Sequence, residues 1–323
     1  MSKQLKSNLL ILLAAFIWGT AFLAQKDGGQ IGTFTFNGIR FLIGGTFLLP
    51  VIYVLDRLRG KKSGSDGPET RSGSDKGVPD MSWNKTVFIG GICCGVILFI
   101  ASSLQQYGVL FTTIGKTGFI TALYTLIVPV FSVVLGKKVP RLTWAAVLIG
   151  LAGLYLLSMF GESLSISYGD RFIIACAFGF AVQIMCIDHF APKVDPVKLS
   201  SIEFLTLGVI SLFFMFAFEE PSLDKIVSVL PSLLYAGILS SGVAYTLQVV
   251  GQQHSEPTQA AIIMCMESVF SLLTGMIVLG ERMAMHEYIG AALIFTAVVM
   301  AQLPDRKAGA GTVKPEVMKN DKR

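Results

Sequence analysis

The chain has 323 residues, of which 53% are hydrophobic and only 15% are charged. Soluble domains average roughly 25% charged residues, so this composition excludes an ordinary soluble protein and predicts a polytopic membrane protein. The formal net charge of +5 comes from basic residues spread over loops and tails rather than gathered on one folded face, which argues against a nucleic-acid partner.

Long apolar stretches predict ten membrane-spanning helices and an all-α fold. Each stretch is close to the roughly 20 residues that a helix needs to cross a bilayer core of about 30 Å. The predicted spans are 7–25, 34–56, 84–105, 115–136, 142–160, 169–190, 198–218, 226–250, 257–279 and 286–303. Residues 57–80 are rich in Gly, Ser, Asp and Lys and predict a disordered cytoplasmic loop, and residues 304–323 predict a disordered tail.

The basic residues predict the orientation of the chain, because cytoplasmic loops carry an excess of Lys and Arg. With the N-terminus inside, 20 of the 26 Lys and Arg residues fall in inner segments and Arg40 lies within a span. The outer five are Lys26, Lys116, Arg171, Lys225 and Arg282. We therefore expect a multi-pass protein of the cell membrane with both termini in the cytoplasm.

The sequence also contains an internal repeat of five spans. The pattern Leu-Gln-x-x-Gly at 104–108 returns at 247–251, and Ala-x-x-x-Gly-x-Ala at 15–21 returns at 175–181. Because five is odd, the second copy must enter the membrane upside down relative to the first. This predicts two inverted halves, 1–160 and 161–303, with a binding site near the midplane between them, as in many secondary transporters.

Short motifs in both halves resemble those of the bacterial EamA type of the drug/metabolite transporter superfamily. Phe-Ile-Trp-Gly-Thr-Ala-Phe at 16–22 and Arg40-Phe41 resemble its early spans, and Glu-Ser-Val-Phe at 267–270 and Leu-Gly-Glu-Arg at 279–282 resemble its second half. Ser268 replaces the usual proline, which puts a helix kink there in doubt. The resemblance favours export of amino acids or related compounds.

Four ionisable residues fall inside or at the ends of predicted spans, where a charge costs roughly 2.5–3.5 kcal/mol and usually faces a cavity or a partner. Glu267, near the midplane, is a candidate proton-titrating or amine-binding carboxylate; the alternative is a structural partner for a neighbouring Ser, Gln or Arg. Arg40 and Glu203 are candidates to close a gate or attract a charged substrate, or else only snorkel or form a local hydrogen bond. Lys116 is a candidate for an anionic substrate group or an interfacial anchor.

Neutral polar and aromatic side chains complete the predicted substrate site: Gln105, Gln248, Tyr124, Gln183 and Trp18. Each of them alone is more easily explained by packing. Together they predict a polar, mostly uncharged cavity with aromatic walls, suited to small amphipathic metabolites.

The sequence contains no motif for enzymatic chemistry: no Walker A, GxSxG, HExxH or Rossmann fingerprint. Its cysteines lie in apolar runs without a CxxC pair, and its histidines lack ligand spacing, so we expect no cofactor and no metal. A membrane enzyme acting on lipid would need clustered His, Asp or Glu, and a channel a continuous polar stripe. The sequence instead predicts a secondary transporter, not an enzyme, with possible proton coupling, whose partners are a small-molecule substrate and membrane lipid.

Overall fold

The computed structural model describes residues 3–63, 82–161, 165–279 and 283–303. Within these ranges the protein is helical and contains no strand. Ten helical segments are long and apolar enough to cross a membrane, which confirms the predicted all-α fold. Most of the polar loop predicted at 57–80 and all of the tail predicted at 304–323 lie outside the described residues. Residues 57–63 are helical, because good helix formers such as Arg57 and Lys61 extend the second span beyond the membrane.

The helices follow one another in the order of the predicted spans. The first five spans are α1 (Lys3–Gly28), α2 (Thr33–Ser63), α3 (Lys85–Gly108), α4 (Ile114–Thr121) with α5 (Tyr124–Val134), and α6 (Arg141–Ser158). The second five are α7 (Tyr168–Phe190), α8 (Pro196–Phe218), α10 (Leu230–Leu234) with the π-helix η4 (Tyr235–Tyr245) and α11 (Thr246–Gln252), α12 (Pro257–Met264) with α13 (Met266–Leu279), and α14 (Met285–Gln302). Four short helices connect them: η1 (Gly29–Ile31), η2 (Val109–Phe111), η3 (Ala191–Lys193) and α9 (Leu223–Ser228).

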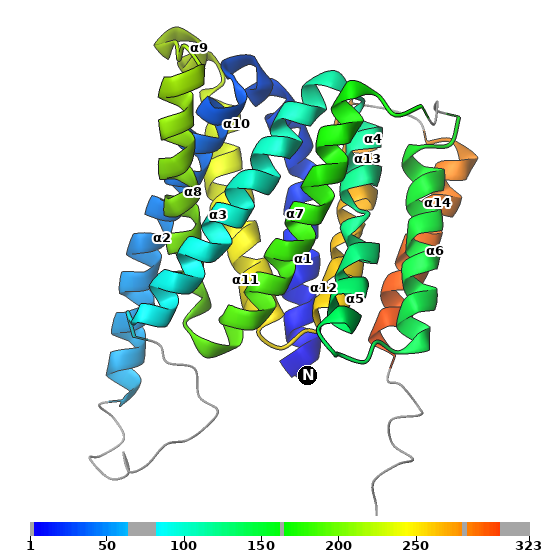
Figure 1. The fold of residues 1–323 in the computed structure, drawn as a ribbon, viewed down its shortest axis with the longest axis horizontal. Coiled ribbons are helices and arrows are strands. Elements are labelled where there is room, and N and C mark those ends of the chain that lie inside the picture. Colours follow the sequence, from blue (N-terminus) through cyan, green and yellow to red (C-terminus); the bar gives the residue numbers. More distant parts are fainter. Residues whose placement is uncertain (1–2, 64–81, 162–164, 280–282, 304–323) are drawn as a thin grey trace, which may run out of the picture.

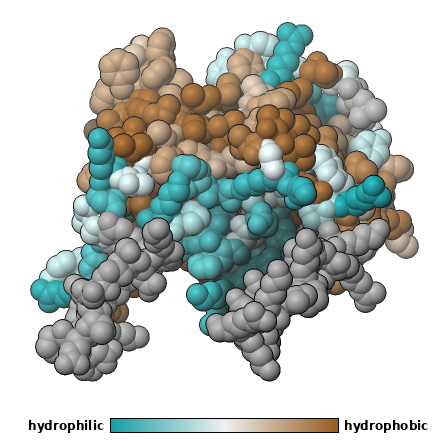
Figure 2. Space-filling model, turned by 60° about the horizontal axis from the view of Figure 1, so that its bottom comes forward, coloured by the Kyte–Doolittle hydropathy of each residue, from teal (hydrophilic) through white to brown (hydrophobic). Residues whose placement is uncertain are grey.

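The spans form one bundle, with α2 and α8 at one edge and α6 and α14 at the other (Figure 1). Large apolar side chains cover its sides; the side chains of Phe213 and Phe216 are 71% and 74% exposed. Figure 2 shows this apolar band above a hydrophilic surface at the end of the bundle where α1 begins. A protein that faces lipid presents such a belt, because apolar side chains can contact lipid tails without a free-energy penalty.

Two of the spans are interrupted near their middle. The fourth span changes from α4 to α5 at Ala122-Leu123, and the ninth changes from α12 to α13 at Cys265. At both places backbone hydrogen bonds tighten to residue i−3, as in Thr125 N to Ala122 O at 3.0 Å and Ser268 N to Cys265 O at 3.2 Å. Neither interruption needs a proline, since Pro129 lies within α5 and position 268 is serine.

Glycines allow the two halves of the chain to approach backbone to backbone. A Cβ on Gly153 of α6 would lie 2.7 Å from Gly290 O of α14, and one on Gly290 would lie 2.6 Å from Gly153 O. On α2, a Cβ on Gly45 would lie 2.8 Å from Leu205 Cγ of α8. At these positions the glycines serve close helix packing.

Glu219, the residue after α8, holds the N-terminus of α2. Its Oε1 accepts a hydrogen bond from Phe34 N at 2.9 Å, and its Oε2 accepts from Thr35 N and Thr35 Oγ1, each at 2.7 Å. These bonds satisfy N–H groups that a helix leaves unpaired in its first turn. At the other end of the same helix pair, Lys198 Nζ lies 2.9 Å from Asp56 Oδ2. Polar contacts therefore fix α2 to α8 at both ends.

Glu219→Gln is expected to lower the free energy of unfolding by about 1.5 kcal/mol or more, because hydrogen bonds to a charged acceptor are replaced by bonds to a neutral one. The apparent Tm in detergent measures this loss. The matched control is Glu220→Gln, since Glu220 is exposed beside it. Equal Tm values for the two variants would mean that the Glu219 cap does not stabilise the bundle.

Candidate functional site

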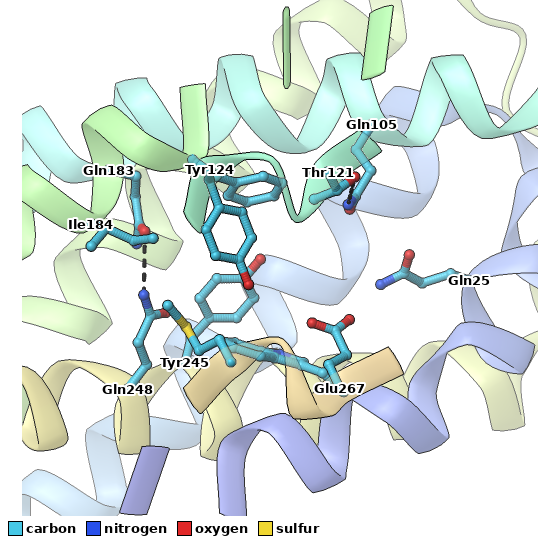
Figure 3. Close-up of a pocket in the computed structure, with 12 residues that line it drawn as sticks. Gln25, Gln105, Thr121, Tyr124, Gln183, Ile184, Tyr245, Gln248 and Glu267 are labelled. Carbon is cyan, nitrogen blue, oxygen red and sulfur yellow. Dashed lines mark hydrogen bonds between the residues drawn. The ribbon is translucent and has the colours of Figure 1, made fainter. Parts of the chain in front are cut away.

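A cavity lies inside the bundle, beside both interrupted spans. The space in it that is open to water molecules is about 50 Å³. The lining comes from both halves of the chain and is shown in Figure 3. The lining residues are Trp18, Gln25, Gln105, Thr121, Tyr124, Phe180, Gln183, Ile184, Tyr245, Gln248, Met264 and Glu267. A smaller lobe continues past Thr121 to Gly118 and Ser268.

Glu267 is the charged residue among the described lining residues. It is the second residue of α13, directly after the interruption at Cys265, and its carboxylate points into the cavity (Figure 3). No described residue hydrogen-bonds to this carboxylate or forms an ion pair with it. Its backbone is held in place by α1, because a Cβ on Gly19 would lie 2.7 Å from Glu267 O. The arrangement presents a carboxyl group that has no protein partner among the described residues, on a backbone held by α1.

Aromatic rings form one wall of the cavity. The rings of Trp18 and Tyr245 meet edge to face with centroids 4.7 Å apart, and Trp18 Nε1 donates to Ser240 O at 3.2 Å. Tyr245 is the last residue of the π-helix, a structure that is rare and often found at functional sites. Tyr124, the first residue of α5, points its hydroxyl into the cavity toward Glu267 (Figure 3).

A chain of buried amides leads from the cavity into the second half. Gln183 Nε2 donates to Glu203 Oε1 at 3.0 Å, and Gln248 Nε2 donates to Gln183 Oε1 at 3.4 Å and to Gln252 Oε1 at 3.0 Å. Glu203 is fully buried and its Oε2 has no hydrogen-bond partner among the described residues. Gln248 Oε1 is likewise buried without a partner among them. The lining side chains of Gln183 and Gln248 thus keep a fixed orientation.

Two further glutamines lie near the C-terminal ends of α1 and α3. Gln105 Nε2 donates to Thr121 Oγ1 at 3.2 Å, and Gln25 reaches toward Glu267 from the opposite side of the cavity (Figure 3). Gln106 Nε2, from the residue next to Gln105, donates to Gln25 O at 3.2 Å and fixes α3 to α1. The cavity therefore extends from the middle of the bundle toward the end opposite the N-terminus.

Six of the nine residues predicted as substrate-binding line this cavity: Glu267, Tyr124, Gln105, Gln248, Trp18 and Gln183. Three do not. Arg40 is 2% exposed, with its guanidinium carbon 4.7 Å and 5.0 Å from the ring centres of Phe41 and Phe36. Glu203 lies behind Gln183.

Lys116 is also outside the cavity, at the start of the fourth span. Its Nζ lies 3.9 Å from Asp170 Oδ2 and donates to Ser165 O at 3.3 Å. Asp170 in turn accepts from Thr112 Oγ1 and from Ser167 N. Lys116 is thus engaged in tying α4 to the start of α7, and its expected contact with a substrate anion has no support in this arrangement.

Sequence reasoning missed several lining residues, of which Gln25, Thr121 and Tyr245 are polar. Tyr245 precedes Gln248 by three positions and Thr121 precedes Tyr124 by three, so helical spacing puts each on the face of a residue already singled out. No comparable signal marks Gln25. Among the described residues, no group of three or more His, Cys, Asp and Glu is placed to hold a metal ion.

Comparison with known proteins gives a consistent result. The model of the EamA-like transporter family matches residues 5–159 and again 167–302. An uncharacterized transporter of Archaeoglobus fulgidus is 28% identical over 303 residues, covering 93% of this chain and 87% of its own. The uncharacterized transporter YetK of Bacillus subtilis is 23% identical, covering 94% and 90%. A solved crystal structure at 21% identity covers 92% of this chain and 98% of its own with a TM-score of 0.71, a likeness of fold alone.

Proposed function

The chain belongs to the EamA-like transporter family and is a multi-pass membrane transporter, and from that premise we propose that it is a secondary exporter of small amphipathic metabolites. The observation that carries the proposal is the cavity at the two interrupted spans, which is lined from both halves of the chain. Interrupted helices are where secondary transporters bind substrate, because the ends of half-helices and their first side chains face the site. Proton coupling would act through Glu267, the uncompensated carboxylate in that cavity.

We further propose that the halves are inverted copies that rock about this cavity. The two interruptions support this, since Tyr124 and Glu267 follow them at equivalent positions of the repeat, and Gln105 and Gln248 are a second equivalent pair. Hydrogen bonds join the halves at both ends of the bundle, as in Gln4 Nε2 to Gln259 Oε1 at 2.8 Å and Ser232 Oγ to Asp27 Oδ2 at 2.5 Å. Alternating access requires the hydrogen bonds at one end of the bundle to break while those at the other end form.

The proposed orientation, with both termini cytoplasmic, predicts which turns can be reached from outside an intact cell. Lys225→Cys should be labelled by a membrane-impermeant maleimide, and Lys138→Cys should be labelled only after the cells are opened. Both positions are exposed. The parent protein, with its native cysteines, sets the background. The reverse pattern would mean that the bundle is inserted the other way round.

Transport itself is tested by substrate exchange in proteoliposomes, with a panel of amino acids and amines loaded on one side and their labelled forms outside. Thr121→Trp should block exchange of any member that moves, because the indole fills the cavity beside Gln105. Ile277→Trp is the matched control, since Ile277 is 77% exposed on the outer surface of α13. Exchange that survives Thr121→Trp at the control rate would place the pathway elsewhere.

A further inference from the structure

We propose that the transported substrate is an organic monocation that carries N–H donors, such as a protonated amine, rather than a zwitterionic amino acid or an anion. The inference rests on the proposed transport through this cavity and specifies the charge that the cavity accepts. Three features of the lining carry it: its charged residue, the direction of its amides and its aromatic wall.

The first feature is charge. The described lining residues include one acidic residue, Glu267, and no Lys, Arg or His. The two cations that sequence placed near the site are engaged elsewhere, Arg40 over the rings of Phe36 and Phe41 and Lys116 with Asp170 and Ser165 O. A substrate carboxylate would therefore meet no positive partner among the described lining residues. An ammonium group would supply the counter-charge that Glu267 lacks, in a charge-assisted hydrogen bond.

The second feature is the direction of the amide groups. Glu203 has only acceptor oxygens when ionised and one acceptor oxygen even when protonated, so Gln183 turns its N–H₂ toward it at 3.0 Å. That turns Gln183 Oε1 toward Gln248 Nε2, which also donates to Gln252. Gln248 Oε1 remains buried without a partner among the described residues.

Two other donors along the lining are engaged: Gln105 Nε2 donates to Thr121 Oγ1, and Trp18 Nε1 donates to Ser240 O. The Glu267 carboxylate and Gln248 Oε1 are acceptors without a partner among the described residues. The Gln25 amide and the tyrosine hydroxyls can both donate and accept. A ligand that brings N–H donors complements the two acceptors, whereas a ligand that brings acceptor oxygens leaves them unpaired, at a cost in affinity.

The third feature is the aromatic wall of Trp18, Tyr124, Phe180 and Tyr245. The faces of such rings carry partial negative charge and attract ammonium groups within about 6 Å of the ring centre. Rings also bury the apolar body of an amine. The wall therefore adds to the preference for a cation that Glu267 sets.

The test is a binding measurement on purified wild-type protein by titration calorimetry, with two matched sets of compounds. One set is 2-phenylethylamine, L-phenylalanine and 3-phenylpropionate; the other is pentylamine, L-norleucine and hexanoate. Within each set the apolar body is the same and only the charged groups differ. In at least one set the amine is expected to bind about tenfold or more tightly than its amino acid and its acid. The carboxylate of the amino acid or acid would be buried without a cationic partner, and the loss is at least one charge-assisted hydrogen bond.

The variants separate charge from packing. Glu267→Gln should weaken amine binding by about 10- to 100-fold, and Glu267→Asp, which keeps the charge, should restore most of it. The proposal is overturned if in neither set the amine binds more tightly than both its amino acid and its acid, or if amine binding does not depend on Glu267. The charge preference can fail while the transporter assignment stands. Exchange of an amino acid that Thr121→Trp blocks would contradict the charge preference and still support transport through this cavity.

Discussion

Glu267→Gln is expected to abolish accumulation of substrate driven by a proton gradient while leaving the protein folded. Glutamine has nearly the same shape as glutamate but cannot take up and release a proton. No described residue pairs with the Glu267 carboxylate, so the variant loses no structural ion pair among them. A gradient of one pH unit is worth about 1.4 kcal/mol per proton, enough to drive tenfold accumulation, and the variant should show none of it. Proteoliposome uptake with and without an imposed gradient measures the effect.

Glu203→Gln is the matched control for that experiment. Glu203 is also an intramembrane glutamate, fully buried, but it lies behind Gln183 and outside the cavity. Glutamine at 203 keeps an oxygen that can accept the Gln183 hydrogen bond. We expect this variant to keep its response to the gradient, with both variants close to wild type in Tm. Normal coupling in Glu267→Gln, or loss of coupling only in Glu203→Gln, would contradict the role assigned to Glu267.

Gly153→Ala is expected to destabilise the bundle by about 1–3 kcal/mol, the usual cost of overpacking. The new Cβ would lie 2.7 Å from Gly290 O and 2.9 Å from Ile294 N, and backbone atoms cannot yield as a flexible side chain does. Helices α6 and α14 would have to separate along their contact. The loss is measured as a lower Tm and a lower yield of folded protein.

Gly118→Ala provides the comparison for Gly153→Ala. Gly118 borders the small lobe of the cavity, and a Cβ there would meet only Ser268 Oγ, at 3.8 Å. The same substitution should therefore leave the free energy of unfolding within about 1 kcal/mol of the wild-type value and even raise it slightly, since alanine is the better helix former. A Tm loss from Gly118→Ala equal to that from Gly153→Ala would mean that α6 and α14 are not packed as closely as described here.

The fold was predictable because the lengths of the apolar stretches locate the membrane-spanning helices. Each predicted span overlaps a membrane-length helix of the structure. The interruptions were harder to predict, because they depend on tertiary packing rather than on a breaker residue. Pro129 lies within α5, while the change of helix in the fourth span falls at Ala122-Leu123, and the ninth span changes at Cys265 although Ser268 stands where the family has proline. No sequence pattern marks the π-helix at 235–245.

Which polar residues line the cavity was predictable only in part. Gln105, Gln183, Gln248 and Tyr124 were found because they recur in the repeat or fall at midspan. Lys116 was expected near the substrate from its depth alone, but depth does not reveal a partner as distant in sequence as Asp170. Arg40 was similarly placed by depth, and the rings of Phe36 and Phe41 that cover it are visible only in the structure.

The measurement that tests alternating access most directly is the accessibility of Thr121→Cys from the two faces of the membrane. Thr121 lines the cavity beside Gln105 and Tyr124, at the end of α4 in the interrupted fourth span. We predict that an impermeant thiol reagent modifies this cysteine when added to either side of oriented vesicles, and that a transported substrate slows both reactions. The parent protein, with Cys176 and Cys265 buried nearby, provides the background. Modification from one side only, unchanged by any substrate, would mean that the cavity is a dead-end pocket and not a transport site.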